Sequence, residues 1–205
     1  MHTEIQLLHK ISEETEFRVY LFSTKYLKSH FMKLLNIEKP VIGMIHLQAL
    51  PGTPKNTYQP NEIIDIAIKE SKQLVKNGID AIAIENMHDT PYMKGEAGAE
   101  IISIMAIVAY EIKKQFKIPL GIQVLAGANK EAMAIAFNAG LDFIRAEGFV
   151  YGHIADEGYM ESCAGELLRY RKLLGAEHVQ VFTDIKKKHS SHLITADVDL
   201  TETAK

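Results

Sequence analysis

The sequence predicts an α/β protein of the (β/α)8 TIM-barrel class, present as a partial barrel of about five βα units with an extra N-terminal segment. Short β-rich runs alternate with amphipathic stretches from Pro40 onward. These runs are apolar almost throughout, which is typical of parallel strands covered on both faces. Residues 78–80 (Gly-Ile-Asp) lead to Glu85, and residues 140–142 (Gly-Leu-Asp) lead to Glu147 at the same offset. Alternate strands of a barrel contribute to the same interior layers, so this echo two units apart indicates a barrel.

Each expected element has a signal of its own. The strands are expected at residues 41–47, 81–85, 121–125, 143–147 and 179–185. The first helix has Asn61 as its potential N-cap and ends at the Asn-Gly pair 77–78. The second helix has an apolar stripe and ends before Pro119; its stripe consists of Ile101, Met105, Val108 and Ile112. The third runs from the potential cap Asn129 to Gly140, the fourth ends at Gly175, and a fifth could start at Asp197 or Asp199.

A doubly wound open sheet is the alternative fold. Neither G-x-G-x-x-G nor G-x-x-x-x-G-K-[ST] stands at a strand-to-helix turn, which argues against a nucleotide-binding fold of that kind. Eight units of about 33 residues would need about 265 residues, close to the ~250 of a typical barrel. We therefore expect residues 40–205 to form one incomplete barrel domain that lacks three βα units.

Residues 1–39 have an irregular apolar pattern and are expected to form an N-terminal extension that is helical or partly ordered. They hold six Lys and Arg residues and five Glu residues. A mitochondrial transit peptide is basic and poor in acidic residues, so this composition gives it little support. We expect a cytoplasmic protein, with a mitochondrial location as the alternative.

Composition limits the classes of partner. The chain has 23 Lys and Arg against 26 Asp and Glu, a net charge of −3, which argues against nucleic acid binding through bulk charge. No apolar run approaches the ~20 residues of a membrane span. One cysteine, Cys163, cannot form an internal disulfide and is expected to begin or pack the fourth helix. An open sheet leaves unpaired edges, so we expect either a homo-oligomer or a partner that covers them.

In this fold, functional groups gather at the carboxyl ends of the strands and in the loops that follow. Glu85 and Glu147 are the candidates for acid–base catalysis, because mutual repulsion and partial burial would let one of them hold a proton near neutrality. The alternative is a structural ion-pair network in which Arg145 and a lysine neutralise both carboxylates. His46 is either a general base or a hydrogen-bonded histidine. The rule selects seven polar residues in all: His46, Glu85, Asn86, Gln123, Arg145, Glu147 and Asp184.

Residues 184–189 (Asp-Ile-Lys-Lys-Lys-His) end the fifth strand and start its loop. Lys186 and Lys187 are expected to bind a phosphate or carboxylate there, and Asp184 beside them could position a proton-transferring ammonium. A solvated basic loop is the alternative. The loop 148–160 is long for a βα connection, so we expect a lid or ligand-contacting loop in which His153 binds substrate. The loop 87–98 is its expected partner across the mouth of the barrel.

No cofactor is evident from the sequence. Three pairs that contain histidine lack the spacing of a zinc site: His88 with Asp89, His153 with Asp156, and His189 with His192. Magnesium held by oxygen atoms of Glu85, Glu147 and Asp184 stays open as an alternative.

Five segments together resemble the BtpA/SgcQ family: residues 40–52 (PVIGMIHLQALPG), 84–89 (IENMHD), 126–129 (AGAN), 145–148 (RAEG) and 183–190 (TDIKKKHS). The resemblance runs from about Met32 to the C-terminus. It implies a TIM barrel of the ribulose-phosphate-binding type with no firmly established reaction, and it implies three further strands that this chain lacks. Some members are linked to photosystem I accumulation, and others are encoded among sugar-metabolism genes.

Three functional hypotheses follow. The first is an enzyme of small phosphorylated or carboxylated metabolites, such as a sugar-phosphate lyase or isomerase, that transfers protons with its carboxylates. The second is a non-catalytic assembly or stability factor, as the photosystem link suggests. The third is an inactive truncated isoform, because barrels of this kind usually bind phosphate with the loops after strands seven and eight.

Overall fold

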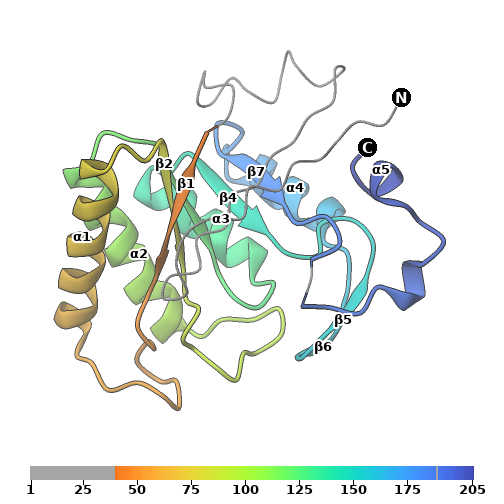
Figure 1. Cartoon of the computed structure of the whole chain (residues 1–205), viewed down its shortest axis with the longest axis horizontal. Helices are drawn as coiled ribbons and strands as arrows, with labels where there is room; N and C mark the ends of the chain where they lie inside the picture. Colours follow the sequence, from red (N-terminus) through yellow and green to blue (C-terminus); the bar gives the residue numbers. More distant parts are fainter. Residues whose placement is uncertain (1–39, 188) are drawn as a thin grey trace.

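Five parallel strands form the central sheet. The computed structural model describes residues 40–187 and 189–205, so the expected N-terminal extension lies outside the described residues. The strands are β1 (Ile42–His46), β2 (Ala81–Glu85), β3 (Leu120–Gln123), β4 (Phe143–Ala146) and β7 (Gln180–Thr183). They lie side by side in the order in which they occur along the chain, and each neighbouring pair is parallel (Figure 1).

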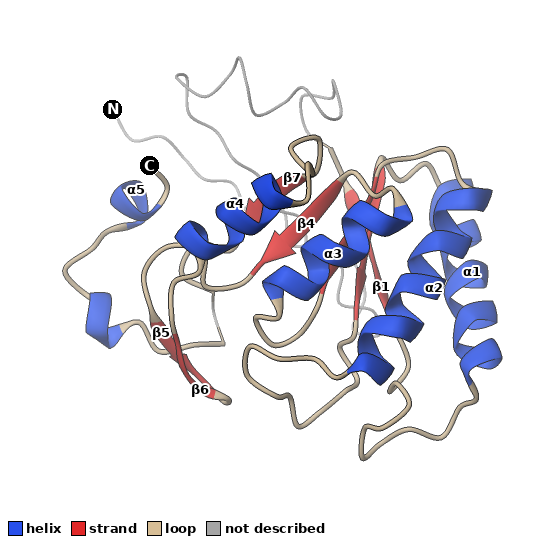
Figure 2. Ribbon diagram, turned by 180° about the vertical axis from the view of Figure 1, so that it is seen from behind, coloured by secondary structure: helices blue, strands red, loops and turns tan. Residues whose placement is uncertain are grey.

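The helices that follow these strands pack against one face of the sheet. They are α1 (Pro60–Lys76), α2 (Ala99–Gln115), α3 (Asn129–Ala139) and α4 (Ala164–Leu173). All four contribute side chains to one hydrophobic core with the sheet, and Figure 2 shows α1 to α4 on the near side of the strands. A doubly wound sheet has a reversal in strand order and helices on both faces. The sequential order and the one-sided helices therefore confirm the predicted α/β fold of barrel-type βα units.

Alternate residues of each strand point to different layers. Ile45, Ile84 and Ile144 belong to the large core beneath the helices. On the opposite face a smaller cluster contains Phe143 and Phe182, whose ring centroids are 4.8 Å apart. Both layers are apolar, which explains why the strands lack the polar alternation of a sheet with one solvated face.

The helix ends follow local chemistry. The helix α1 begins at Pro60 after Gln59, whose backbone N–H donates to Glu62 Oε2 at 2.7 Å, so the expected cap Asn61 is wrong by two residues. Proline suits the first helical position because the N–H it lacks would have no partner there. Asn129 is the first residue of α3 rather than its cap. Asp199 caps the short helix α5 (Leu200–Thr203) by accepting from the N–H of Glu202, which confirms one of the two expected caps.

The repeated Gly-x-Asp motif fastens the amino ends of the strands. Asp80 Oδ2 accepts the N–H of Val41 at 2.7 Å, and Asp142 Oδ2 accepts the N–H of Leu120 at 2.8 Å. Each aspartate precedes its own strand and binds the start of the preceding strand. Gly140, with a φ of 69°, ends α3 in the left-handed conformation that lets the chain turn into the next strand. The repeated Gly-x-Asp motif therefore has a structural role at the amino ends of the strands.

The long connection between β4 and α4 contains a hairpin that the sequence did not predict. Its strands are β5 (His153–Ala155) and β6 (Gly158–Met160), which pair antiparallel. Ile154 also pairs with Ser191 in the segment after β7, which continues into the 3-10 helix η1 (Leu193–Thr195). Lys94 donates to the carbonyl of Tyr159 at 3.1 Å, so the loop 87–98 contacts the hairpin in the loop 148–160.

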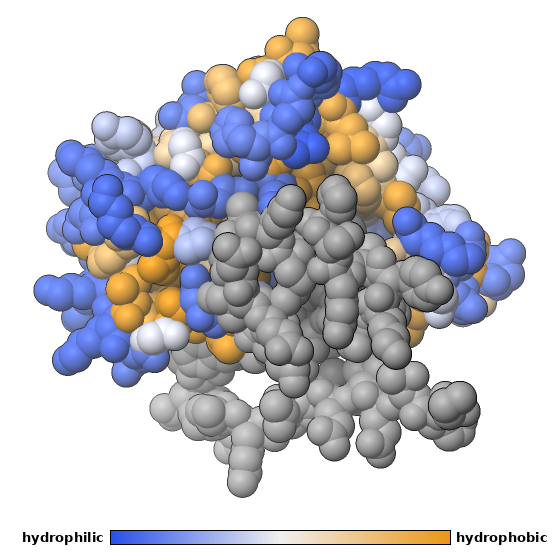
Figure 3. All heavy atoms as spheres, turned by 90° about the horizontal axis from the view of Figure 1, so that it is seen from above, coloured by the Kyte–Doolittle hydropathy of each residue, from blue (hydrophilic) through white to orange (hydrophobic). Residues whose placement is uncertain are grey.

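The surface is mixed in character. Figure 3 shows hydrophobic residues between hydrophilic ones over the coloured part of the visible face. Strongly exposed apolar side chains occur on separate elements, such as Leu173 in α4 and Leu193 in η1. In the part of the chain that the structure describes, no helix has the length and apolar character needed to cross a membrane.

Candidate functional site

Polar side chains follow one another across the carboxyl ends of the sheet. His46, Glu85 and Gln123 are the last residues of β1, β2 and β3, and the strand register sets them side by side. The register between β3 and β4 pairs residue 122 with residue 144, so one step further Gln123 lies beside Arg145. Asp184 directly follows β7. The residues predicted from strand ends therefore lie along one edge of the sheet.

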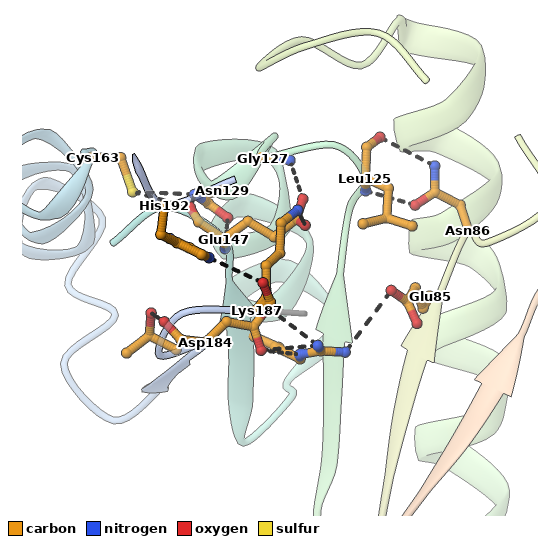
Figure 4. A network of polar contacts seen from close by, with 12 residues as sticks. Glu85, Asn86, Leu125, Gly127, Asn129, Glu147, Cys163, Asp184, Lys187 and His192 are labelled. Carbon is orange, nitrogen blue, oxygen red and sulfur yellow. Dashed lines mark hydrogen bonds and ion pairs between the residues drawn. The ribbon is translucent and has the colours of Figure 1, made fainter. Parts of the chain in front are cut away.

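Four of these residues form a chain of polar contacts, with His46 at one end and Asp184 at the other. His46 Nε2 lies 3.3 Å from Glu85 Oε2. On its other side, Glu85 Oε1 lies 4.0 Å from Arg145 Nη1, and Figure 4 marks this contact of Glu85 with a dashed line. Arg145 donates to Asp184 Oδ1 from Nε at 3.1 Å and from Nη2 at 2.9 Å. The contacts extend from the first strand to the loop after the last strand of the sheet. Glu85 is therefore part of an ion-pair network, which the sequence left as an alternative.

Glu147 follows β4 and is held on both of its carboxylate oxygens. Oε1 accepts from Lys187 Nζ at 2.7 Å, and Oε2 accepts the N–H of Gly127 at 2.8 Å. Only 5% of Glu147 is exposed. A buried carboxylate of this kind requires a counter-charge and hydrogen bonds, and Lys187 and Gly127 supply them.

Asn129 fixes the backbone of Glu147. Its Nδ2 donates to the Glu147 carbonyl at 2.7 Å, and its Oδ1 accepts the Glu147 N–H at 3.1 Å. The same Nδ2 lies 3.1 Å from Cys163 Sγ. Burial of the Cys163 side chain raises the pKa of its thiol. Cys163 precedes α4 as its N-cap residue, as expected for a packing residue. The sequence predicted Asn129 as a helix cap and did not predict its two hydrogen bonds to the backbone of Glu147, which we call the Asn129 clamp.

Asn86, predicted as a binding residue, positions two loops. Its Oδ1 accepts the N–H of Leu125 at 2.8 Å, and its Nδ2 donates to Asp89 Oδ2 at 2.8 Å. Asp89 Oδ1 in turn accepts the N–H of Leu50. Burial raises the pKa of Asp89, and its two hydrogen bonds act in the opposite direction. Sequence reasoning missed this role of Asp89, although its spacing of three residues from Asn86 is that of a tight turn.

The loop after β7 turns its lysines to different partners. Lys187 binds Glu147, whereas Lys186 Nζ donates to the carbonyl of Thr195 at 2.9 Å. Asp184 pairs with Arg145, whereas Lys186 and Lys187 bind other groups. Lys186 has a φ of 48°, a left-handed conformation that is uncommon outside glycine. This turn separates the directions of the adjacent side chains.

His153 lies beside this loop and is 5% exposed. Burial, and then the positive charges of Lys187 and His192, lower the pKa of His153, with Asp184 acting in the opposite direction. Its ring centroid is 5.4 Å from that of His192. Among the described residues, His153 Nε2 has no hydrogen-bond partner.

Two cavities adjoin the site. The first, about 20 Å³, lies between the loop after β7 and the hairpin, and its lining includes His153, Asp184, Lys186, Lys187 and Thr203. This volume holds a group about the size of a water molecule. The second, about 210 Å³, lies on the side of Glu147 that faces α3 and α4, and its lining includes Lys94, Gly127, Tyr159 and Cys163.

Among the described residues, the carboxylates considered as metal ligands do not form one group. Over residues 40–187 and 189–205, no three His, Cys, Asp or Glu side chains form a group that could hold a metal ion. Glu85, Glu147 and Asp184, the oxygen ligands considered for magnesium, are thus not gathered into one set. Each of them instead contacts a cationic side chain.

The fold and the site define an α/β protein built from barrel-type βα units with its polar residues at the carboxyl ends of the strands. The chain belongs to the BtpA family, whose model matches residues 37–205. This match confirms the family that the five sequence segments indicated.

Relatives span three domains of life. An uncharacterized mitochondrial protein of Caenorhabditis elegans is 52% identical over 179 residues, covering 84% of this chain and 65% of the relative. An uncharacterized protein of Archaeoglobus fulgidus is 37% identical over 161 residues, covering 78% and 64%. The photosystem I biogenesis protein BtpA of Synechocystis is 33% identical over 159 residues, covering 78% and 55%. The chain therefore spans less than two thirds of the length of these relatives.

Proposed function

We propose that this chain binds a small phosphorylated or carboxylated metabolite at the carboxyl ends of its parallel strands and transfers protons to or from it. The observation that carries the proposal is the unbroken series of contacts from His46 through Glu85 and Arg145 to Asp184. Ligand sites of barrels are built at this end of the strands. A row of charged groups contributed by successive strands is unnecessary for a packed core, and it suits a polar ligand.

The anion would bind at the loop after β7. Lys186, Lys187 and His153 line the water-sized cavity there, so the anion would bind outside that cavity, against the same loop. An ammonium group has three N–H donors, and Glu147 takes one of those of Lys187. The remaining donors can turn to a phosphate or carboxylate. In this proposal Glu147 is a positioning residue, since it holds the lysine that contacts the ligand.

His46 would transfer the proton. Its Nε2 faces Glu85, so a proton on Nε2 leaves Nδ1 to act as a base. Glu85 then orients the imidazole ring, in the way that a carboxylate orients the histidine of a catalytic triad. Arg145 and Asp184 fix the position of Glu85 from its other side. This division of roles modifies the expectation that Glu85 and Glu147 form an acid–base pair.

Thermal unfolding with added inorganic phosphate or a phosphate ester tests the proposal. A ligand that binds only the folded state stabilises it by about 1.4 kcal/mol at ten times its Kd. We expect both probes to raise the Tm of the full chain and to lose this effect in Lys187→Met and in Lys186→Met. The control is Lys172→Met, because Lys172 is an exposed residue of α4 that pairs with Glu177. No response of the unaltered chain, or an equal response in all variants, would overturn the proposal.

An assembly or stability role is the second candidate. It is favoured by the name of the Synechocystis relative, a photosystem I biogenesis protein. Such a role predicts a stable partner complex and no stabilisation by small anions. Size-exclusion chromatography of the chain from its native source, with mass spectrometry of the associated proteins, distinguishes this candidate from a metabolite site.

A second copy or another partner could cover the sheet edges. Among the described residues, β1 pairs only with β2, and β7 pairs only with β4. Unpaired strand edges promote association. Sedimentation velocity is expected to show an oligomer, and a monomer over a wide concentration range would contradict this expectation.

We also propose a mitochondrial location for this protein. The name of the C. elegans relative describes a mitochondrial protein, which favours the mitochondrial alternative over the cytoplasm. Fractionation of cells that express the full chain with a C-terminal tag tests this: recovery in the cytosolic fraction would contradict a mitochondrial location.

A further inference from the structure

Gln123 holds a buried polar group without a partner. It is the last residue of β3, and only 1% of it is exposed. Its Oε1 has no hydrogen-bond partner in the part of the chain that the structure describes. Buried amides in folded proteins are nearly always hydrogen-bonded, because the lost contact with water is otherwise uncompensated. A buried amide oxygen without a partner at the carboxyl end of a strand therefore points to a ligand group that binds it.

The neighbours of Gln123 restrict the chemistry of that ligand group. Glu85 is its register partner on β2, and the register places Arg145 beside it on β4. The guanidinium of Arg145 disfavours a cationic group at this position, and the carboxylate of Glu85 disfavours an anionic one. A neutral ligand group beside Gln123 is repelled by neither Glu85 nor Arg145.

A hydroxyl is the neutral group that suits the amide best. It donates one hydrogen bond and accepts others, so it can pair with either end of the glutamine amide. This property holds whichever way the amide of Gln123 is turned. An ether or a ketone, which can only accept, would leave Oε1 without a partner.

We infer that Gln123 binds a hydroxyl group of the ligand and sets specificity for hydroxylated anions over anions with a plain carbon chain. The inference rests on the proposed function, because it assumes that the anion binds at the loop after β7. Two strand spacings of about 4.8 Å separate β3 from β7. A ligand of a few carbon atoms, together with the lengths of the Gln123 and Lys187 side chains, can span this separation.

Isothermal titration calorimetry on the full chain tests this with a matched pair of ligands, glycerol 3-phosphate and n-propyl phosphate. The two have the same anionic group and the same number of carbon atoms, but only the first carries hydroxyls. We expect glycerol 3-phosphate to bind about tenfold more tightly, since a site built to hydrogen-bond a hydroxyl discriminates against an analogue that lacks it. Gln123→Met should abolish the preference and leave the affinity for n-propyl phosphate unchanged.

Two controls make the outcomes separable. Gln180→Met alters a glutamine at the start of β7, at the opposite end of the sheet, and should keep the preference. Gln123→Ala provides a second test of the position if the methionine variant fails to fold. Equal binding of both esters by the unaltered chain, or a preference that survives in the Gln123 variants, would overturn the inference while the proposed function stands. Binding of neither ester would remove the proposed function and the inference with it.

Discussion

Arg145 binds Asp184 through two of its nitrogens, at 2.9 and 3.1 Å, and thereby joins β4 to the loop after β7. The side chains are 15% and 9% exposed, and Glu85 lies 4.0 Å from the same guanidinium. The arginine thus lies between two carboxylates from different elements. Its planar fork of donors suits this position better than the single ammonium of a lysine would.

Replacing this arginine should destabilise the chain. In Arg145→Met, Asp184 and Glu85 both lose a cationic partner in a largely buried setting, so we expect a loss of about 3–5 kcal/mol in the free energy of unfolding. Urea denaturation measures the loss. The surface pair of Lys172 and Glu177 provides the control, since Lys172→Met should cause little change. A loss below about 1 kcal/mol in Arg145→Met would contradict a structural role for the pair.

Asn129→Ala should also destabilise the chain. The substitution leaves the N–H and the carbonyl of Glu147 without their partner in a buried position. Each unpaired buried group costs about 1–3 kcal/mol, so we expect a total loss of about 2–6 kcal/mol. Asn138→Ala is the matched control, because Asn138 is exposed and its side chain donates to the carbonyl of Ala134 on the same helix. If both variants unfolded at the same urea concentration, the clamp at Asn129 would have no energetic importance.

Acid should destabilise the chain through His153. The folded state lowers the pKa of His153 below its usual 6.5, so the unfolded chain binds more protons in the pH interval between these two values. Stability therefore falls as the pH decreases from about 7 through that interval, and the loss levels off below the folded pKa. Urea denaturation at a series of pH values measures this dependence.

The His153→Gln variant isolates this contribution. Its stability should depend less on pH, from about 7 downward, than that of the unaltered chain, because the titrating group is gone. His178→Gln serves as the control, since His178 is exposed. The same pH dependence in His153→Gln and in the unaltered chain would show that His153 is not responsible.

Cys163 should react slowly in the folded chain. Burial raises the pKa of its thiol, which reduces the fraction of the reactive thiolate at neutral pH. We expect alkylation by iodoacetamide at pH 8 to be severalfold slower in buffer than in urea, where the thiol is exposed. Mass spectrometry over time gives both rates. A native rate at or above the unfolded rate would indicate an activated cysteine and would contradict the packing role.

The sequence predicted the βα units because their signals are local. An apolar run of a few residues followed by an amphipathic helix identifies each strand and helix, and Gly140 ends α3 where its left-handed conformation is needed. The Gly-x-Asp echo also has a local cause, since Asp80 and Asp142 each bind the start of the preceding strand. The hairpin β5–β6 lacked such a signal, because its strands have three residues each and show no alternation.

The sequence predicted which residues lie at the strand ends, but it did not predict which of their side chains bind each other. The rule that functional groups lie at strand ends selected His46, Glu85 and Arg145, and the register sets these residues along one edge. The partner of each charge depends on side-chain direction and on the path of the loops. Asp184 is near three lysines in the sequence, whereas in the structure it binds Arg145 from another strand. Spacing along the chain does not determine such contacts.

The most direct test of the account maps where a phosphate ester binds. Backbone amide NMR spectra of the full chain, recorded during titration with glycerol 3-phosphate, locate the affected residues. We predict shifts in the amides that follow the strands, at residues 86, 124, 147 and 184–187, and none at residues 41, 80, 120 and 142 at the amino ends. Shifts at the amino ends, or shifts spread over the whole surface, would contradict a ligand site at the carboxyl ends of the sheet.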